Sequence, residues 1–244
     1  DDMIPDDAVE RLMDSAQKIG IACESAGVAE WEIFASQGYG NSLDIEAGKI
    51  SMASGGGEGG FGIRLVEDGR YGFAHLVDPS SAERAIQQAL SIARKSPSIE
   101  GFELPGNQSA SSVSGMKDKA ILDMGPEDLL EQGDQVLTRV TELDSRAVAV
   151  GGGIGVGAGA GAIVTSSGIE SGGVYTSHGI GIHVSIDEDD HLTSSYEGES
   201  SRGLLKDLTA CVDKAVHWSQ ITRQKIDGGE TEDCPVLMTS DGFS

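Results

Sequence analysis

Cysteine, aromatic residues and long apolar runs are all scarce in this sequence of 244 residues. Its three cysteines, Cys23, Cys211 and Cys234, lie far apart and form no Cys-x-x-Cys pair, so we expect a reducing compartment and no disulfide framework. No apolar run approaches the ~18 residues that span a bilayer, and the first residues lack the pattern of a signal peptide. These features predict a cytoplasmic protein.

Basic residues are also few. Lysine and arginine total 17 against 40 aspartates and glutamates, which gives a formal net charge of −23. A surface of this sign repels phosphate backbones and anionic lipid, so we expect no nucleic-acid partner and no membrane partner. The excess of acid is explained either by solubility or by an acidic docking surface.

Glycine, in contrast, is abundant, with 35 residues, and it separates short segments in which apolar and polar residues alternate. Three- and four-residue apolar spacing predicts helices at Pro5–Ala26, Ser80–Lys95, Pro126–Leu143 and Gly203–Gln224. Alternation predicts strands at Glu30–Gln37, Ser42–Glu46, Lys49–Ala53, Gly60–Glu67 and Tyr71–His75, and again at Ala147–Gly155, Gly157–Thr165, Ile169–Thr176, Gly179–Ile186 and His191–Glu197. The pattern predicts an α+β protein of two units, each a helix, a meander of antiparallel strands and a helix.

The division between the units is predicted from composition. Pro97, Pro105 and a serine-rich stretch interrupt the periodic segments. We therefore expect a first domain at residues 1–100, a linker at 101–120, a second domain at 121–232 and the start of a further domain at 233–244. A capping box at Ser80–Glu83 and a two-residue hairpin turn at Asp68-Gly69 are predicted within the first unit.

Two motifs resemble ligand sites. The run Gly151–Gly161 contains matches to a dinucleotide-binding pattern, but alternating apolar residues continue into more strand instead of the required helix, which favours a glycine-rich hairpin. The acidic cluster Asp187–Asp190 lacks the glycine and the distal glutamate of an EF-hand loop, and it lies between two predicted strands. A solvated hairpin tip is the better interpretation.

The five histidines do not form a zinc site at local spacing. If Asp187–Asp190 is a four-residue turn, Ile186 faces His191, and His183 lies on the opposite face of the sheet. His178 shares the face of His191 but lies about 26 Å from Ile186 along the strand. His75 and His217 have no ligand-type neighbour at helical or hairpin spacing. Zinc needs three or four converging ligands, so only a long-range arrangement could supply one.

Candidate nucleophiles are equally unconvincing. Cys23 and Cys211 lie on apolar helix stripes, where packing is the default role, and no Gly-x-Ser-x-Gly elbow is present. Ser200, Ser201 and Arg202 are predicted to begin the last helix. We therefore assign no catalytic, cofactor-binding or metal-binding residue in this chain.

Three stretches resemble the TldD/PmbA family, which has also been called modulator of DNA gyrase. Glu32–Lys95, with the core GGFGIRLVEDGRYGFAHL, is similar to the N-terminal domain of that family. Val164–Arg202 resembles the middle domain, with Ser166-Ser167-Gly168 where the family commonly has Asn-Ser-x-Gly. Cys234–Met238 resembles the strand that opens the third domain.

The resemblance implies a role in proteolysis or peptide maturation. In this family a zinc peptidase subunit carries its ligands in the third domain, and a partner subunit without them completes a chamber for unfolded peptides. The chain would be the non-catalytic N-terminal portion of such a subunit, PmbA-like in type, that assembles as a homo- or hetero-oligomer, with zinc only in a third domain or a partner. The alternative is a stand-alone binding or assembly module that reuses the fold without peptidase activity.

Overall fold

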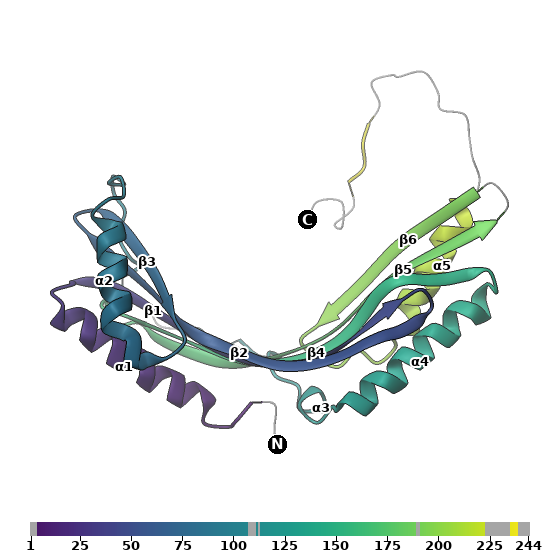
Figure 1. Ribbon diagram of the computed structural model, residues 1–244, viewed down its shortest axis with the longest axis horizontal. Coiled ribbons are helices and arrows are strands. Elements are labelled where there is room, and N and C mark those ends of the chain that lie inside the picture. The colour runs from purple at the N-terminus through teal and green to yellow at the C-terminus, as the bar shows by residue number, and fades with distance from the viewer. Residues whose placement is uncertain (1–3, 107–110, 112, 189–190, 223–234, 239–244) are drawn as a thin grey trace.

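The computed structural model describes residues 4–106, 111, 113–188, 191–222 and 235–238 (Figure 1). The helices are α1 Ala8–Ser25, α2 Ala82–Ala93, α3 Lys119–Leu122, α4 Pro126–Leu143 and α5 Thr209–Ile221, with a 3₁₀ turn at Pro79–Ser81. The strands are β1 Glu30–Glu46, β2 Lys49–Glu67, β3 Arg70–Leu76, β4 Ala147–Thr165, β5 Glu170–Glu188 and β6 His191–Ser201. Helices and antiparallel strands together confirm the predicted α+β class.

All six strands belong to one antiparallel sheet with the order β3-β2-β1-β4-β5-β6. β1 pairs with β4 from Glu32↔Thr165 to Glu46↔Gly151. Strands from the first and second halves of the sequence therefore lie side by side along most of their length.

Four strands are longer than the sequence predicted. β1, β2, β4 and β5 each join two predicted strands, so the breaks predicted at residues 38–41, 54–59, 156 and 177–178 lie inside strands. The prediction of five short strands in each half was wrong in this respect. Ladder hydrogen bonds use only backbone groups, so a glycine does not end a strand when neighbours on both sides hold it in place.

Turn chemistry was predicted more accurately. Asp68 and Gly69 have φ values of 53° and 68°, and Ala47 and Gly48 have values of 50° and 75°. Positive φ at both central residues is the type I′ geometry, which matches the twist of the flanking strands. These turns set the registers Glu67↔Arg70 and Glu46↔Lys49.

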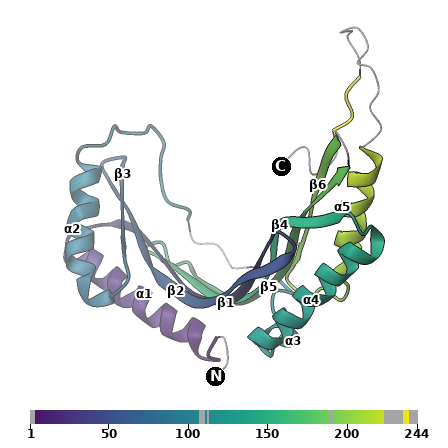
Figure 2. The ribbon, with the colours of Figure 1, turned by 45° about the vertical axis from the view of Figure 1, so that its right-hand side comes forward.

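The sheet is bent into a long U, and the described helices cover its outer, convex side (Figures 1 and 2). α1 and α2 cover one end, where they pack on residues such as Ile33, Ile63 and Ala160. α4 and α5 cover the other end over Leu43, Ile154, Ile182 and similar side chains. Each fully buried aliphatic side chain contributes roughly 1.5–3 kcal/mol. Both cores use β1 and β4, so both depend on the central strand pair.

Helix boundaries differ from the prediction mainly at their ends. The capping box at Ser80–Glu83 is not formed; instead, the Asp78 carboxylate accepts a hydrogen bond from the Ser80 backbone N–H. The last helix begins at Thr209 and not at Gly203, because the N–H groups of Leu204 and Leu205 bond to side chains elsewhere. None of the described helices is long and apolar enough to cross a membrane.

The predicted strand at Cys234–Met238 is not formed where the structure describes it. Residues 235–238 have no regular secondary structure, and the side chain of Leu237 is 93% exposed. Cys234 lies outside the described residues.

Candidate functional site

The inner, concave face of the sheet is nearly bare of side chains at its centre. Cross-strand pairing places four consecutive rows on this face, and we call them the trough. The rows are Gly60, Ser36, Gly161, Gly173; Glu58, Gly38, Gly159, Tyr175; Gly56, Gly40, Gly157, Ser177; and Ser54, Ser42, Gly155, Gly179, Ser200. In these rows only Glu58 and Tyr175 are larger than serine.

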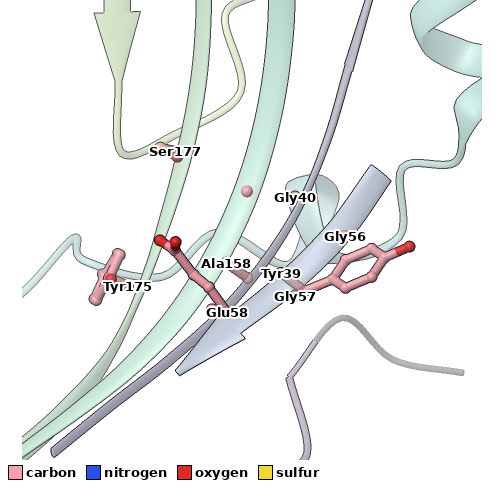
Figure 3. Close-up of a pocket in the computed structure, with 10 residues that line it drawn as sticks. Tyr39, Gly40, Gly56, Gly57, Glu58, Ala158, Tyr175 and Ser177 are labelled. Carbon is pink, nitrogen blue, oxygen red and sulfur yellow. The ribbon is translucent and has the colours of Figure 1, made fainter. Parts of the chain in front are cut away.

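The side chains of the trough project away from the helices. Figure 3 shows Glu58, Tyr175 and Ser177 on one side of the sheet and Tyr39 on the other. Two hollows of about 360 Å³ and about 510 Å³ lie against the trough, and both are lined by Gly40, Gly157 and Ser177. The strands therefore present their backbone to a continuous shallow depression.

The glycines of the trough are of two kinds. At Gly159, a Cβ atom would lie 2.4 Å from Cζ of the Tyr175 ring, so the ring itself requires glycine beneath it. At Gly155, the nearest atom to such a Cβ is 3.8 Å away, and at Gly56 and Gly173 nothing lies within 4 Å. Packing within this chain does not require glycine at these open positions, although glycine inside a strand costs roughly 0.5–1 kcal/mol relative to alanine.

The Tyr175 ring lies between Gly159 and the guanidinium group of Arg202. The Cζ atom of Arg202 lies 5.1 Å from the centroid of the Tyr175 ring, within the range of a cation–π contact. The Arg202 carbonyl accepts a hydrogen bond of 2.6 Å from Oγ1 of the buried Thr176, which itself accepts one from the Asp118 N–H. The Asp118 carboxylate accepts from Leu204 and Ala120 N–H groups, and the Leu204 contact is the main cause of its lowered pKa.

His178 lies directly behind the trough and is fully buried. Its Nδ1 accepts a hydrogen bond from the Leu205 N–H, so Nε2 carries the proton and donates to Oε1 of Gln132 at 3.2 Å. Burial lowers the pKa of His178. The neutral ring joins β5 to α4 and to the segment after β6, which is a structural role.

The other histidines do not converge with His178. His75, His183 and His217 are exposed, and within the described ranges no group of three or more histidine, cysteine, aspartate or glutamate side chains could hold a metal ion. His191 pairs with Glu188 and not with Ile186, so the predicted four-residue turn was wrong in register.

The described part of the acidic cluster belongs to a strand. Asp187 and Glu188 belong to the end of β5, and Glu188 forms an ion pair with Arg146. Residues 189 and 190 lie outside the described part of the chain. The same arginine makes two hydrogen bonds to the Asp144 carboxylate and holds the pKa of Asp144 well below its usual range. The Asp187–Glu188 segment thus continues the sheet.

Cys23 and Cys211 are buried in the two cores, as their helix stripes predicted. Burial raises the pKa of the Cys23 thiol to about 12 and that of Cys211 to about 11. Neither thiol has the lowered pKa of a nucleophile.

Sequence reasoning missed the three residues that mark the trough: Glu58, Tyr175 and Arg202. Arg202 was expected to begin a helix, but it follows the last residue of β6. One signal in the sequence was the strict alternation of glycine and apolar residues through Gly153–Gly161, which places all five of these odd-numbered glycines on one face.

Comparison with known proteins supports the sequence interpretation. Residues 31–93 match the family model of PmbA/TldA metallopeptidase domain 1. An uncharacterized protein of Methanocaldococcus jannaschii is 26% identical over 162 residues, which cover 66% of this chain and 35% of the relative.

Solved structures share the fold. TldE from Thermococcus kodakarensis matches with a TM-score of 0.71 at 22% identity, over 86% of this chain and 47% of that protein. A proposed modulator of DNA gyrase from Bacteroides thetaiotaomicron matches with a TM-score of 0.73 at 19% identity, over 88% of this chain and 50% of that protein. A similarly described Thermotoga maritima protein matches with a TM-score of 0.71 at 12% identity, over 85% of this chain and 47% of that protein.

The chain thus spans about half the length of these structures and about a third of the archaeal relative. At these identities the structural matches show a common fold, and the family assignment comes from the match to domain 1. Residues 31–93 therefore belong to domain 1 of the PmbA/TldD family, as the sequence resemblance predicted.

Proposed function

We propose that this chain is a non-catalytic portion of a TldD/PmbA-type peptidase subunit, PmbA-like in type, and that its concave face receives an extended polypeptide. The observation that carries this proposal is the trough, whose four rows contain only two side chains larger than serine. A strand-like peptide is a slender ligand that needs close access to backbone and little side-chain bulk opposite it. A folded partner would need a broader contact surface.

Two further features support an extended polypeptide as the ligand. The trough is bordered by serine hydroxyls, such as those of Ser177 and Ser200, and by exposed backbone, which suit ligands of varied sequence. Its only acidic side chain is Glu58, so the centre of the concave face is far less charged than the chain as a whole.

Bond cleavage is assigned to another part of the assembly. The described residues bring together no set of metal-ligating side chains, so we place the zinc of this peptidase family in a further domain or in a TldD/PmbA-type partner subunit. The acidic chain would serve proteolysis by holding the substrate. A stand-alone binding module would use the same trough, and only the partner distinguishes the two.

The test measures binding of a fluorescein-labelled, unstructured peptide of about ten residues to the full chain by anisotropy. Gly56→Val and Gly155→Val place side chains in the trough where the fold leaves room, so each should weaken binding about tenfold or more. Gly106→Val is the matched control, since a Cβ there, as at Gly56, meets nothing within 4 Å but lies in the predicted linker.

Unchanged affinity in both trough variants would place the peptide elsewhere. The bound peptide is then analysed by mass spectrometry with and without added Zn²⁺. Intact peptide is expected in both cases, and chelator-sensitive cleavage would refute the non-catalytic assignment. Addition of a zinc-bearing family subunit that yields cleavage would separate the subunit role from that of a stand-alone module.

A further inference from the structure

Arg202 stands at one end of the trough, and most of its N–H donors have no hydrogen-bond partner among the described residues. Its guanidinium group stacks on Tyr175 and directs a single weak bond of 3.5 Å from Nη1 to the Thr176 carbonyl. A guanidinium group has five N–H donors. Among the described residues no carboxylate lies within 4.0 Å of it, although acids outnumber bases by 40 to 17.

The position of this guanidinium is built by the fold. The carbonyl of Arg202 is bonded to the fully buried Thr176, and the next residues are tied to Asp118 and His178 through the N–H groups of Leu204 and Leu205. Tyr175 in turn lies against Gly159, which leaves its ring little room to move toward the sheet. The arginine is therefore presented on an ordered platform.

The opposite end of the trough has the opposite charge. Glu58 and Tyr175 share one row, with only Gly38 and Gly159 between them, so they are three strand spacings or ~14 Å apart. An anionic group on a ligand is thus repelled at the Glu58 end and attracted at the Arg202 end. The trough therefore has a negative charge at one end and a positive charge at the other.

We infer that Arg202, stacked on Tyr175, binds a carboxylate of the ligand that occupies the trough. This inference rests on the proposed function, and it adds the chemical group that is recognised. A guanidinium group pairs with a carboxylate through two parallel N–H···O bonds, and stacking on an aromatic ring keeps its fork oriented. The carboxylate comes from the C-terminus of a peptide or from an aspartate or glutamate side chain.

The experiment compares three labelled octapeptides of serine, glycine and valine with the full chain at 0.15 M salt. One has a free C-terminal carboxylate, one is the C-terminal amide, and one is the amide with a central glutamate. The net charge of −23 disfavours both anionic peptides at long range, so any preference for them must arise locally. We expect at least one anionic peptide to bind about tenfold tighter than the neutral amide, as a charged hydrogen-bonded pair provides.

Variants then assign the preference to the stacked arginine. Arg202→Gln should bind the anionic and neutral peptides equally, whereas Arg84→Gln, which removes the same charge from the exposed face of α2, should keep the tenfold preference. Tyr175→Phe should keep it because the ring remains, and Tyr175→Leu should lower it.

The outcomes separate the two proposals. Tighter binding of the free-acid peptide identifies a C-terminal carboxylate, and tighter binding of the glutamate peptide identifies an acidic side chain. If all three peptides bind equally to the native chain, or if Arg202→Gln keeps the preference, the carboxylate site is refuted while peptide binding in the trough stands. If none of the peptides binds, both proposals fail.

Discussion

Two glycines on the same strand and the same face should respond in opposite directions when each is changed to alanine. Gly153 and Gly155 both belong to β4 and face the concave side, where they pair with Asp44 and Ser42 of β1. A Cβ atom at Gly153 would lie 2.6 Å from the carbonyl oxygen of Leu43. At Gly155 the nearest atom would be 3.8 Å away, which is ordinary van der Waals contact.

The difference in free energy of unfolding follows from these distances. Gly155→Ala reduces the conformational freedom of the unfolded chain without a clash, so we expect a gain of about 0.4–1 kcal/mol. Gly153→Ala pushes against the backbone of a central strand that cannot move alone, so a loss of about 1–3 kcal/mol is expected, as for an overpacked core. In a chain of this size, 1 kcal/mol corresponds to roughly 2–4 °C in melting temperature.

Urea unfolding followed by circular dichroism measures both variants against the native chain. The midpoint should rise for Gly155→Ala and fall for Gly153→Ala with little change in slope. Equal shifts of the same sign, or a stabilised Gly153→Ala, would refute the register between β1 and β4 on which the trough depends.

Three further predictions concern buried and paired groups. The pKa of Asp144 is lowered by Arg146, so its carboxylate should stabilise the fold fully above about pH 4 and less as the pH falls toward the lowered pKa. Asp144→Asn should therefore make the free energy of unfolding depend less on pH below about pH 4. His178 is kept neutral by burial, so stability should decline as the pH falls below about 6.5, and His178→Gln should remove that slope at some loss of stability at neutral pH. The thiols of Cys23 and Cys211, with pKa values raised to about 12 and about 11, should react with a thiol reagent at pH 8 only after denaturant is added; fast labelling of either in the native chain, shown by peptide mapping, would contradict their burial.

Local patterns predicted the elements whose causes are local. The helix Pro126–Leu143 was expected and found with the same bounds, because its proline start, acidic first turn and apolar spacing all act within one segment. The turn at Asp68-Gly69 was found for the same reason. Strand lengths were wrong, because breaks were placed in the glycine-rich middles of β1, β2 and β4 and at residues 177–178 of β5, where the strands continue.

The alternation of residue types through β4 was sufficient to predict one long strand. Even-numbered residues from Ile154 to Val164 are buried without interruption, while glycines fill the odd-numbered positions as far as Gly161. A single period of two over so long a stretch indicates one strand with one bare face. The trough itself could not be predicted, since it depends on the register between β1 and β4, which are separated by about a hundred residues of sequence.

The bent shape of the sheet and the bare trough have a shared physical cause, but curvature does not explain the whole glycine pattern. Side chains on the inner face of a bent sheet crowd one another, so small residues there permit the bend. Close approach accounts for Gly159 and Gly153, where a methyl group would meet a ring or a backbone carbonyl. It does not account for Gly56 or Gly173, where the space is open and alanine would make a more stable strand. The proposed ligand, an extended backbone that comes close to the sheet, would account for glycine at such positions and would connect the shape of the fold with the binding of an extended chain.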